Sequence, residues 1–321
     1  YTTALYRMSQ YQKLVEIAAE IIALIDEDEQ YQDIMGKIMV YYGWGWLHAG
    51  EYTNAQFYFD RAYRIYQELE DPYGLIRSLH GRGTIAFVYG DYELCDVFNT
   101  RALGYSQASN DKQGLADSYV NLGVTAFMRG DYEGCIAYQE KARVLFEEIG
   151  EIRGLGQINN NLGMAYEALK QFDKAETCYR KSIESSIQIQ DLRISYNTEV
   201  NLGFMLLNQN PYSLVARQYL YRAVLKSQHR PLSIVYLESV TGLAYLLFYD
   251  GEVTNSAKLA GALRENPNIT AELLSNRLKP LIEQYQSFLD EEEITTLLDA
   301  GETADLSELV TATLAQYALY E

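Results

Sequence analysis

Glycine recurs at a fixed interval along most of this chain of 321 residues. One series, spaced 40 residues apart without a slip, comprises Gly43, Gly83, Gly123, Gly163 and Gly203. Two shorter series keep the same period, namely Gly50, Gly90 and Gly130, and Gly74, Gly114 and Gly154. A period of roughly 20 to 50 residues indicates an array of small units that stack because none buries its apolar surface alone. We therefore expect a repeat array.

The stretch 114–154 shows what one unit contains. Two runs of small and apolar residues with helical spacing lie on either side of Gly130-Asp131-Tyr132, which predicts two amphipathic helices joined by a turn. Gly123 falls in the middle of the first helix, where glycine costs about 1 kcal/mol relative to alanine. That cost is offset if the missing side chain lets a neighbouring helix approach. At the turn, Gly130 favours a positive φ, and we expect Tyr132 to pack the turn into the core.

Composition agrees with an all-helical protein and narrows its partners. Only five prolines occur, and we interpret most of the 29 tyrosines as packing residues at half-buried helix contacts. The net charge is −18 and the sequence has no run of Lys or Arg, which argues against direct binding of nucleic acid or of an anionic membrane. The sequence has no apolar run near the roughly 18 residues of a membrane span and no secretory signal, so we expect a cytoplasmic protein.

Nothing in the sequence predicts catalysis. The motif GxxxxGK[ST], the motif HExxH and a nucleophile elbow are all absent. His48, His80 and His229 have no carboxylate or cysteine pattern around them that would mark a metal site or a triad. Cys95 and Cys135 hold the same place in successive units and are interpreted as small core residues. We expect no enzymatic activity, cofactor or metal.

The period divides the chain into a repeat region and a tail. Residues 1–265 are expected to form a half repeat (1–30) followed by about six helix pairs. Residues 266–321 are expected to form C-terminal capping helices, around 270–289, 291–299 and 306–319, because a stack must cover its last apolar face. Asp305 with Glu308 is a candidate cap for the last helix. The chain begins with Tyr1 and a half repeat, and we interpret it as part of a longer protein.

The repeat pattern resembles the tetratricopeptide repeat (TPR). The third unit carries Leu122-Gly123, Gly130-Asp131-Tyr132, and the small residues Cys135 and Ala142 of that consensus. The period of 40 exceeds the usual TPR period of about 34, as in the longer variant of the family. Arg82 departs from the pattern, which expects Leu there. The resemblance implies an all-α, right-handed TPR-type α-solenoid.

The tail is similar to the end of MalT-like regulators. The runs concerned are Lys258-Leu-Ala-Gly-Ala-Leu263, Asp299-Ala-Gly-Glu302 and Leu306-Ser-Glu-Leu309. Those regulators belong to the STAND class, the signal-transduction ATPases with numerous domains. The resemblance implies that this chain is the sensor part of such a protein, with the ATPase domain upstream. Binding of a ligand to the sensor would then release the ATPase for self-assembly in the full-length protein.

A concave groove lined by the first helix of each pair is the expected binding surface. With the repeat glycine of each first helix counted as position 8, positions 4, 7, 8 and 11 are expected to pack inward, and positions 2, 5, 6, 9, 12 and 13 to face the groove. The candidate groove residues are Lys37, Tyr41, Trp44, His48, Arg77, His80, Asn121, Phe127, Met128, Gln157, Asn160, Asn161, Met164, Asn197, Asn201 and Phe204.

Three features of this set suggest what it binds, and each has a structural alternative. Its aromatic and Met residues are of the kind that anchor a partner, although Trp44, Phe127 and Phe204 could instead be core residues. Lys37, Arg77 and His80 could receive an anionic group of a ligand. The asparagines one repeat apart, Asn121, Asn161 and Asn201, could bond the backbone of an extended peptide, as such a ladder does in related repeat proteins, or only a neighbouring helix.

Three functions remain open from the sequence. The first is a non-enzymatic sensor module that binds a peptide, a protein or a small ligand in the groove. The second is a constitutive scaffold that holds protein partners without switching. The third is a peptide-pheromone receptor of the kind that also uses TPRs.

Overall fold

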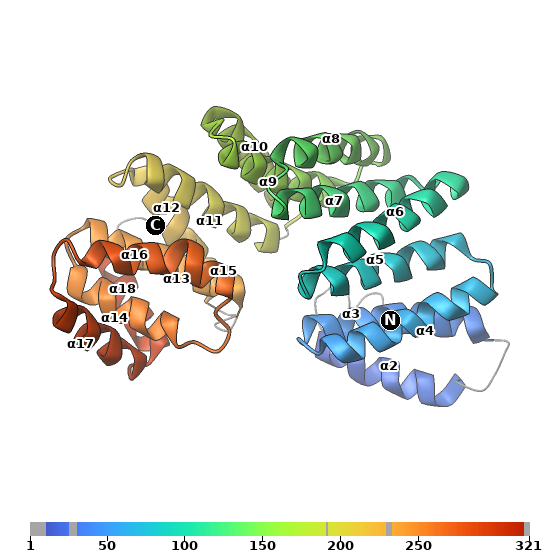
Figure 1. Ribbon diagram of the computed structural model, residues 1–321, viewed down its shortest axis with the longest axis horizontal. Helices are drawn as coiled ribbons and strands as arrows, with labels where there is room; N and C mark the ends of the chain where they lie inside the picture. The colour runs from blue at the N-terminus through green and yellow to red at the C-terminus, as the bar shows by residue number, and fades with distance from the viewer. Residues whose placement is uncertain (1–10, 26–30, 191, 229–232, 318–321) are drawn as a thin grey trace. The chain divides into compact units, whose positions relative to one another are not determined.

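The computed structural model describes residues 11–25, 31–190, 192–228 and 233–317, and these form helices joined by turns, with no strand among them. Backbone contacts divide the chain into two compact units, Tyr1–Ala165 (unit 1) and Tyr166–Glu321 (unit 2). The elements are labelled in Figure 1. The expected all-α class is confirmed.

Unit 1 consists of helices that, from α2 to α8, pack in chain order, each on the next. They are α2 (Tyr11–Ile25), α3 (Gln32–His48), α4 (Tyr52–Glu68), α5 (Pro72–Val88), α6 (Tyr92–Ser109), α7 (Lys112–Met128), α8 (Tyr132–Ile149) and the greater part of α9 (Ile152–Ala168). Helix α5 also contacts α3 on one side and α7 on the other, so the first helices of successive pairs lie side by side (Figure 1).

The turns within the pairs adopt the expected left-handed conformation. Gly50, Gly90 and Gly130 have φ values of +81°, +76° and +80°, a region in which only glycine is free of strain. The following Asp131 caps α8 by accepting a hydrogen bond from the backbone N of Gly134 at 2.8 Å, and Asp91 caps α6 in the same way. The aromatic residue after the turn packs as expected at Tyr92 and Tyr132, which are half-buried against Phe87 and Phe127. Tyr52 and Phe172 are less buried, at 37% and 38% exposed.

The mid-helix glycines give the close approach that the sequence predicts. A Cβ atom at Gly43 would lie 2.8 Å from the ring of Phe59 in α4, and one at Gly123 would lie 2.6 Å from Gln139 in α8. Real Cβ atoms do not come so near, so a larger residue at Gly43 would press on the rigid Phe59 ring, while one at Gly123 would require the Gln139 amide to move.

Arg82, which replaces the leucine of the repeat pattern, is held at a contact of three helices. Its Nε is 2.8 Å from a carboxylate oxygen of Asp60 in α4. Its guanidinium carbon lies 4.8 Å from the centre of the Tyr63 ring and 4.5 Å from that of Phe98 in α6. Two aromatic faces and one carboxylate thus compensate for the cation at a position that otherwise takes an apolar side chain.

Unit 2 contains further helix pairs and the tail. Its elements are α10 (Phe172–Gln188), α11 (Leu192–Gln209), α12 (Leu214–Ser227), α13 (Ile234–Tyr249), α14 (Val253–Arg264), α15 (Ala271–Leu273), the π-helical turn η2 (Leu274–Leu278), α16 (Lys279–Tyr285), α17 (Glu291–Glu302) and α18 (Leu306–Tyr317). The last helix is capped as expected, because Asp305 Oδ1 accepts hydrogen bonds from the backbone N of Ser307 and of Glu308.

The described apolar residues are distributed differently in the two units. In unit 1 they form several small clusters between neighbouring helices, such as that of Met35, Met39 and Tyr66. In unit 2 one large cluster joins α11–α14 to the tail, which contributes residues such as Tyr285 and Leu298. The tail therefore packs against the last helix pairs, whereas the division into repeats up to residue 265 and a cap beyond it stays a prediction.

Candidate functional site

The first helices of unit 1 present a narrow line of accessible side chains at positions 2, 6, 9 and 13. At about 100° per residue, these positions cover about 60° of helix surface. We call this line the exposed strip. Its exposed or half-buried members are Lys37, Tyr41, Trp44 and His48 on α3, Arg77, Thr84 and Val88 on α5, and Asp117, Asn121, Val124 and Met128 on α7.

Position 5 was expected in the groove, and for four of its five residues this is wrong, since only Asn160 is half-buried. Val40, His80, Val120 and Val200 are all buried. Position 5 lies only about 60° around the helix from the repeat glycine. Each first helix packs against both a second helix and the first helix of the next pair, so its buried arc is wider than one contact would make it.

His80 consequently has a structural environment. Its Nε2 is 2.8 Å from Oγ of Ser118 in α7, and its side chain is 8% exposed. Burial lowers the pKa of His80 to about 4, so the ring is neutral at pH 7. The expected cationic group of Lys37, Arg77 and His80 therefore reduces to its first two members, and Nζ of Lys37 is paired with Asp33 at 2.7 Å.

Beside Arg77 the strip carries the carboxyl group of Asp117, which has further acidic neighbours. Burial raises the pKa of Asp117 to about 6, and the nearby carboxylates of Asp111 and Glu151 act in the same direction. Hydrogen bonds from Gln113 Nε2 at 3.0 and 3.1 Å, and the charge of Arg77, act against this rise. This part of the strip therefore combines one cation with a carboxyl group that titrates close to neutral pH.

Asp117→Asn is expected to stabilise the protein at pH 8 by about 1–2 kcal/mol, allowing for solvent around a half-buried group. The folded-state pKa of Asp117 lies above the usual value, so the folded protein binds this proton more tightly than the unfolded chain. The stability that this tighter proton binding gives the wild-type chain is complete at low pH and is lost as the pH rises through about 6. Urea unfolding of both proteins from pH 8 to pH 4 would show the gain shrinking toward zero. A gain that is independent of pH would mean that Asp117 does not act through its charge.

The amide side chains of unit 1 do not act as a uniform ladder. Asn121 Nδ2 donates to Oδ1 of Asn99 in α6 at 3.0 Å, which is the neighbouring-helix alternative. Asn160 Nδ2 contacts Sδ of Met164 within α9 at 3.6 Å. Asn161 differs, because its Nδ2 is buried and has no hydrogen-bond partner. Gln157, one turn earlier, is exposed.

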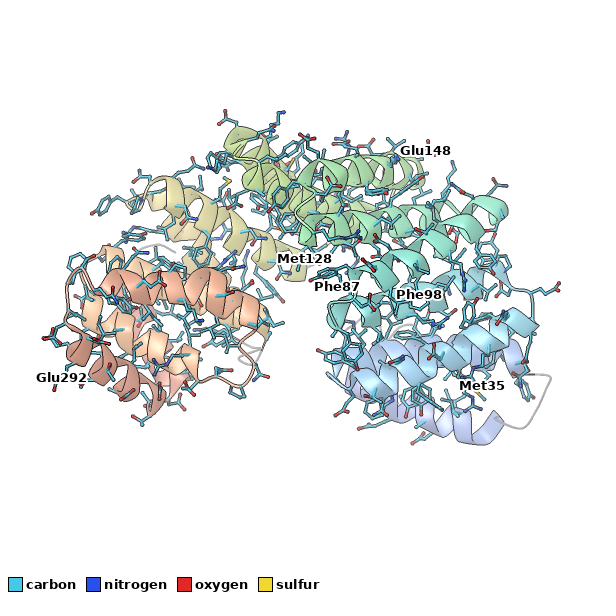
Figure 2. The ribbon with its side chains drawn as sticks, viewed as in Figure 1. Met35, Phe87, Phe98, Met128, Glu148 and Glu292 are labelled. Atoms are coloured by element: carbon cyan, nitrogen blue, oxygen red, sulfur yellow. The ribbon has the colours of Figure 1, made fainter. Side chains whose placement is uncertain are left out.

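The apolar candidates of unit 1 pack against core side chains and are also partly accessible at the surface. The Trp44 ring meets Phe59 edge-on, with centroids 5.3 Å apart, and joins the clusters between α3 and α5. Phe127 packs on Tyr132 at 5.3 Å, while the adjacent Met128 is 37% exposed. Figure 2 shows Phe87 and Met128 at the corresponding ends of α5 and α7. These residues can present one side to a ligand without losing their packing on the other.

In unit 2 the tail covers two of the candidates. Arg277 of η2 donates from Nη2 to Oδ1 of Asn201 in α11 at 3.2 Å. Its guanidinium carbon lies 4.0 Å from the centre of the Phe204 ring. Phe204 is only 5% exposed, so its expected place in an open groove is wrong. Asn197, earlier on the same helix, is exposed.

Other polar groups surround this contact. The hydroxyl of Tyr245 donates to the backbone carbonyl of Arg277 at 2.8 Å, and that of Tyr179 donates to Oε2 of Glu167 at 2.7 Å. Burial raises the pKa of Glu167, while the Tyr179 hydroxyl and the charge of Arg277 oppose this rise. We call these six residues, Glu167, Tyr179, Asn201, Phe204, Tyr245 and Arg277, the Arg277 cluster. Sequence reasoning missed Arg277 because it lies outside the repeats and no motif marks it.

The described residues can be compared with the requirements of metal binding, thiol chemistry and membrane insertion. They contain no group of three or more His, Cys, Asp or Glu side chains placed to hold a metal ion. Burial raises the pKa of the Cys95 and Cys135 thiols to about 11, which makes them poor nucleophiles at neutral pH. Within the same residues, no helix is both long and apolar enough to cross a membrane.

Comparison with known proteins identifies the repeat. The family model for the tetratricopeptide repeat matches residues 114–188, which include the unit with the clearest sequence pattern. No curated protein matches the chain.

Several solved structures are similar. The apo form of the quorum sensor NprR from B. thuringiensis has a TM-score of 0.62 and 13% identity, over 99% of this chain and 92% of that chain. A Rap protein complexed with Competence and Sporulation Factor has a TM-score of 0.59 and 14% identity, over 79% of this chain and 74% of that chain. A STAND protein with a TPR sensor from Pyrococcus horikoshii has a TM-score of 0.57 and 14% identity, over 94% of this chain and 43% of that chain. The fold is that of a TPR α-solenoid.

Proposed function

We propose that this chain is a non-enzymatic sensor module that binds a peptide, a protein or a small ligand, and that it belongs to a STAND-type signalling protein. The exposed strip carries the proposal. It runs over three consecutive first helices and combines Trp44 and Met128 with charged and amide groups. Such a mixture is typical of surfaces that anchor a partner through a few aromatic residues. We expect the module to act in the cytoplasm, to bind neither nucleic acid nor membrane, and to self-assemble only within a longer protein.

The structural neighbours support binding by this fold and suggest a second candidate. The STAND neighbour has a TPR sensor, and this chain corresponds to less than half of its length, as a sensor part would. NprR is a quorum sensor and is matched over almost its whole length, while the Rap protein is complexed with a factor. A peptide receptor without an ATPase is therefore the alternative. The genomic sequence upstream of Tyr1 separates the two, because only a STAND protein would encode a P-loop there.

Trp44→Ala and Arg77→Glu are each expected to weaken binding at the strip by about 2 kcal/mol or more, which is roughly 30-fold in Kd. Trp44 supplies the largest ring of the strip and Arg77 a cation on the next first helix. A random peptide library is first selected for binding to the immobilised chain. The Kd of one selected peptide for each variant is then measured by calorimetry. Met128→Ala adds a variant that removes an exposed side chain with little risk to the fold.

Phe57→Ala and Arg101→Glu are matched controls, because both residues are exposed but lie on second helices, α4 and α6. Both are expected to bind the selected peptide as the unaltered chain does. Circular dichroism would establish that each variant is folded. Unchanged affinity in folded Trp44→Ala and Arg77→Glu would remove the strip from consideration. A constitutive scaffold would be indicated if the only partners recovered were whole proteins that bind without altering the chain.

A further inference from the structure

Arg277 is an incompletely paired cation inside unit 2. A guanidinium group has five N–H donors, and the printed hydrogen bond of this side chain is the one from Nη2 to Asn201. Its Nη1 is buried without a hydrogen-bond partner. Among the described residues no carboxylate forms an ion pair with it, although Arg264 and Arg217 in the same unit each have one.

This arrangement is costly unless something completes it. The Arg277 side chain as a whole is half-buried, but its enclosed Nη1 has lost water without gaining a hydrogen bond, and an unsatisfied donor of a charged group carries a desolvation cost. Phe204 compensates in part through its ring face. Glu167 is near enough to interact with Arg277 electrostatically, but its own hydrogen bond is to Tyr179. The π-helical turn that carries Arg277 is of a kind found frequently at functional sites.

We propose that Arg277 is a receptor for a carboxylate group, at a second site that lies within unit 2 and goes beyond the function proposed for the strip of unit 1. A carboxylate is planar and offers two acceptors to the guanidinium fork, so it would engage the unused Nη1. It also carries a single negative charge, so nearby Glu167 repels it less than it would repel a dianionic phosphate. A dianionic phosphate would be left with a net charge beside Glu167, which disfavours it.

Binding at Arg277 and movement of the tail are coupled in this arrangement. Nη1 is covered by protein atoms, so the proposed carboxylate would reach it only if the atoms around the guanidinium move. Such a shift would break the contacts of Arg277 with Asn201 and Phe204. The carboxylate can belong to the C-terminus of a peptide or to a small organic acid.

The test observes the side-chain Nε–H signal of Arg277 by NMR in the full chain labelled with ¹⁵N-arginine, and Arg277→Lys assigns that signal by its loss. The probes are acetyl-Gly-Gly with a free carboxylate, the same dipeptide as its amide, acetate, and inorganic phosphate. We expect a saturable shift with the free dipeptide and none with the amide. An equal response to acetate would support the site and name a small acid as its source. The Arg101 signal is the control and is expected to stay in place.

A shift that the amide reproduces, a response to phosphate alone, or no shift with any probe would each overturn the proposal. Arg277→Met supplies a second measurement. It is expected to unfold at the wild-type temperature or above, because a half-buried cation with one unsatisfied donor is replaced by an apolar side chain of similar length. A markedly lower melting temperature would assign Arg277 a structural role and contradict the inference. Because the tests of Trp44 and Arg77 report on unit 1, failure of the proposed function there can be told apart from failure here.

Discussion

Gly261→Ala is expected to destabilise the packing of α17 on α14 and to lower the free energy of unfolding by about 3 kcal/mol. A Cβ atom at Gly261 would overlap the backbone carbonyl of Leu298, and one at Gly301 would overlap that of Lys258. A flexible side chain can move aside, but a backbone carbonyl within a helix cannot. The two helices must therefore separate, and the large core of unit 2 loses the apolar side chains of α17.

The measurement is urea unfolding followed by circular dichroism. Gly104→Ala is the matched control, because Gly104 lies in helix α6 with nothing within 4 Å of its missing Cβ. There the higher helix propensity of alanine is expected to stabilise the chain by up to about 1 kcal/mol. If both alanine variants had the same stability, the backbone contact between α14 and α17 would not be as close as described.

Lowering the pH from 7 to 5 is expected to cost about 2 kcal/mol of stability through His80 alone. Its folded-state pKa of about 4 lies below the usual value of 6.5. At a pH between these two values His80 is protonated in the unfolded chain but not in the folded protein. The stability due to His80 is therefore complete above pH 7 and falls as the pH falls. Asp117 acts in the opposite direction over this range, since its pKa is raised.

His80→Gln isolates this contribution, because glutamine keeps a polar group near Ser118 and does not titrate. Chemical unfolding of both proteins at pH 7 and pH 5 gives the difference between their losses of stability. The contributions of the carboxyl groups, which the two proteins share, cancel in that difference. We expect the variant to lose about 2 kcal/mol less than the wild-type chain over this interval. Parallel losses in the two proteins would show that His80 takes up its proton in the folded state.

The features that could be predicted from sequence are those decided within one repeat. The positive φ of Gly50, the close approach at Gly43 and the cap by Asp305 follow from residue type and local spacing. The tail resemblance also has a physical meaning, because two of its short motifs contain Gly261 and Gly301, the residues at which α14 and α17 meet.

The features that could not be predicted depend on which neighbour covers a side chain. The repeat glycine marks only one of the surfaces on which a first helix packs, so His80 was wrongly expected to be accessible. The cover over Phe204 comes from a residue outside the repeats, and the hydrogen bond of Arg277 to Asn201 spans 76 positions in the chain. No period in the sequence extends to that contact.

The small separate clusters of unit 1 have a mechanical consequence. Because apolar contacts there are shared between adjacent helices, a slight rotation of one pair disturbs only its immediate neighbours. Such a surface is compliant, and the spacing of its helices can change by small steps. The single large cluster of unit 2 cannot yield in this way, so a force applied to its tail is borne by all of its helices together.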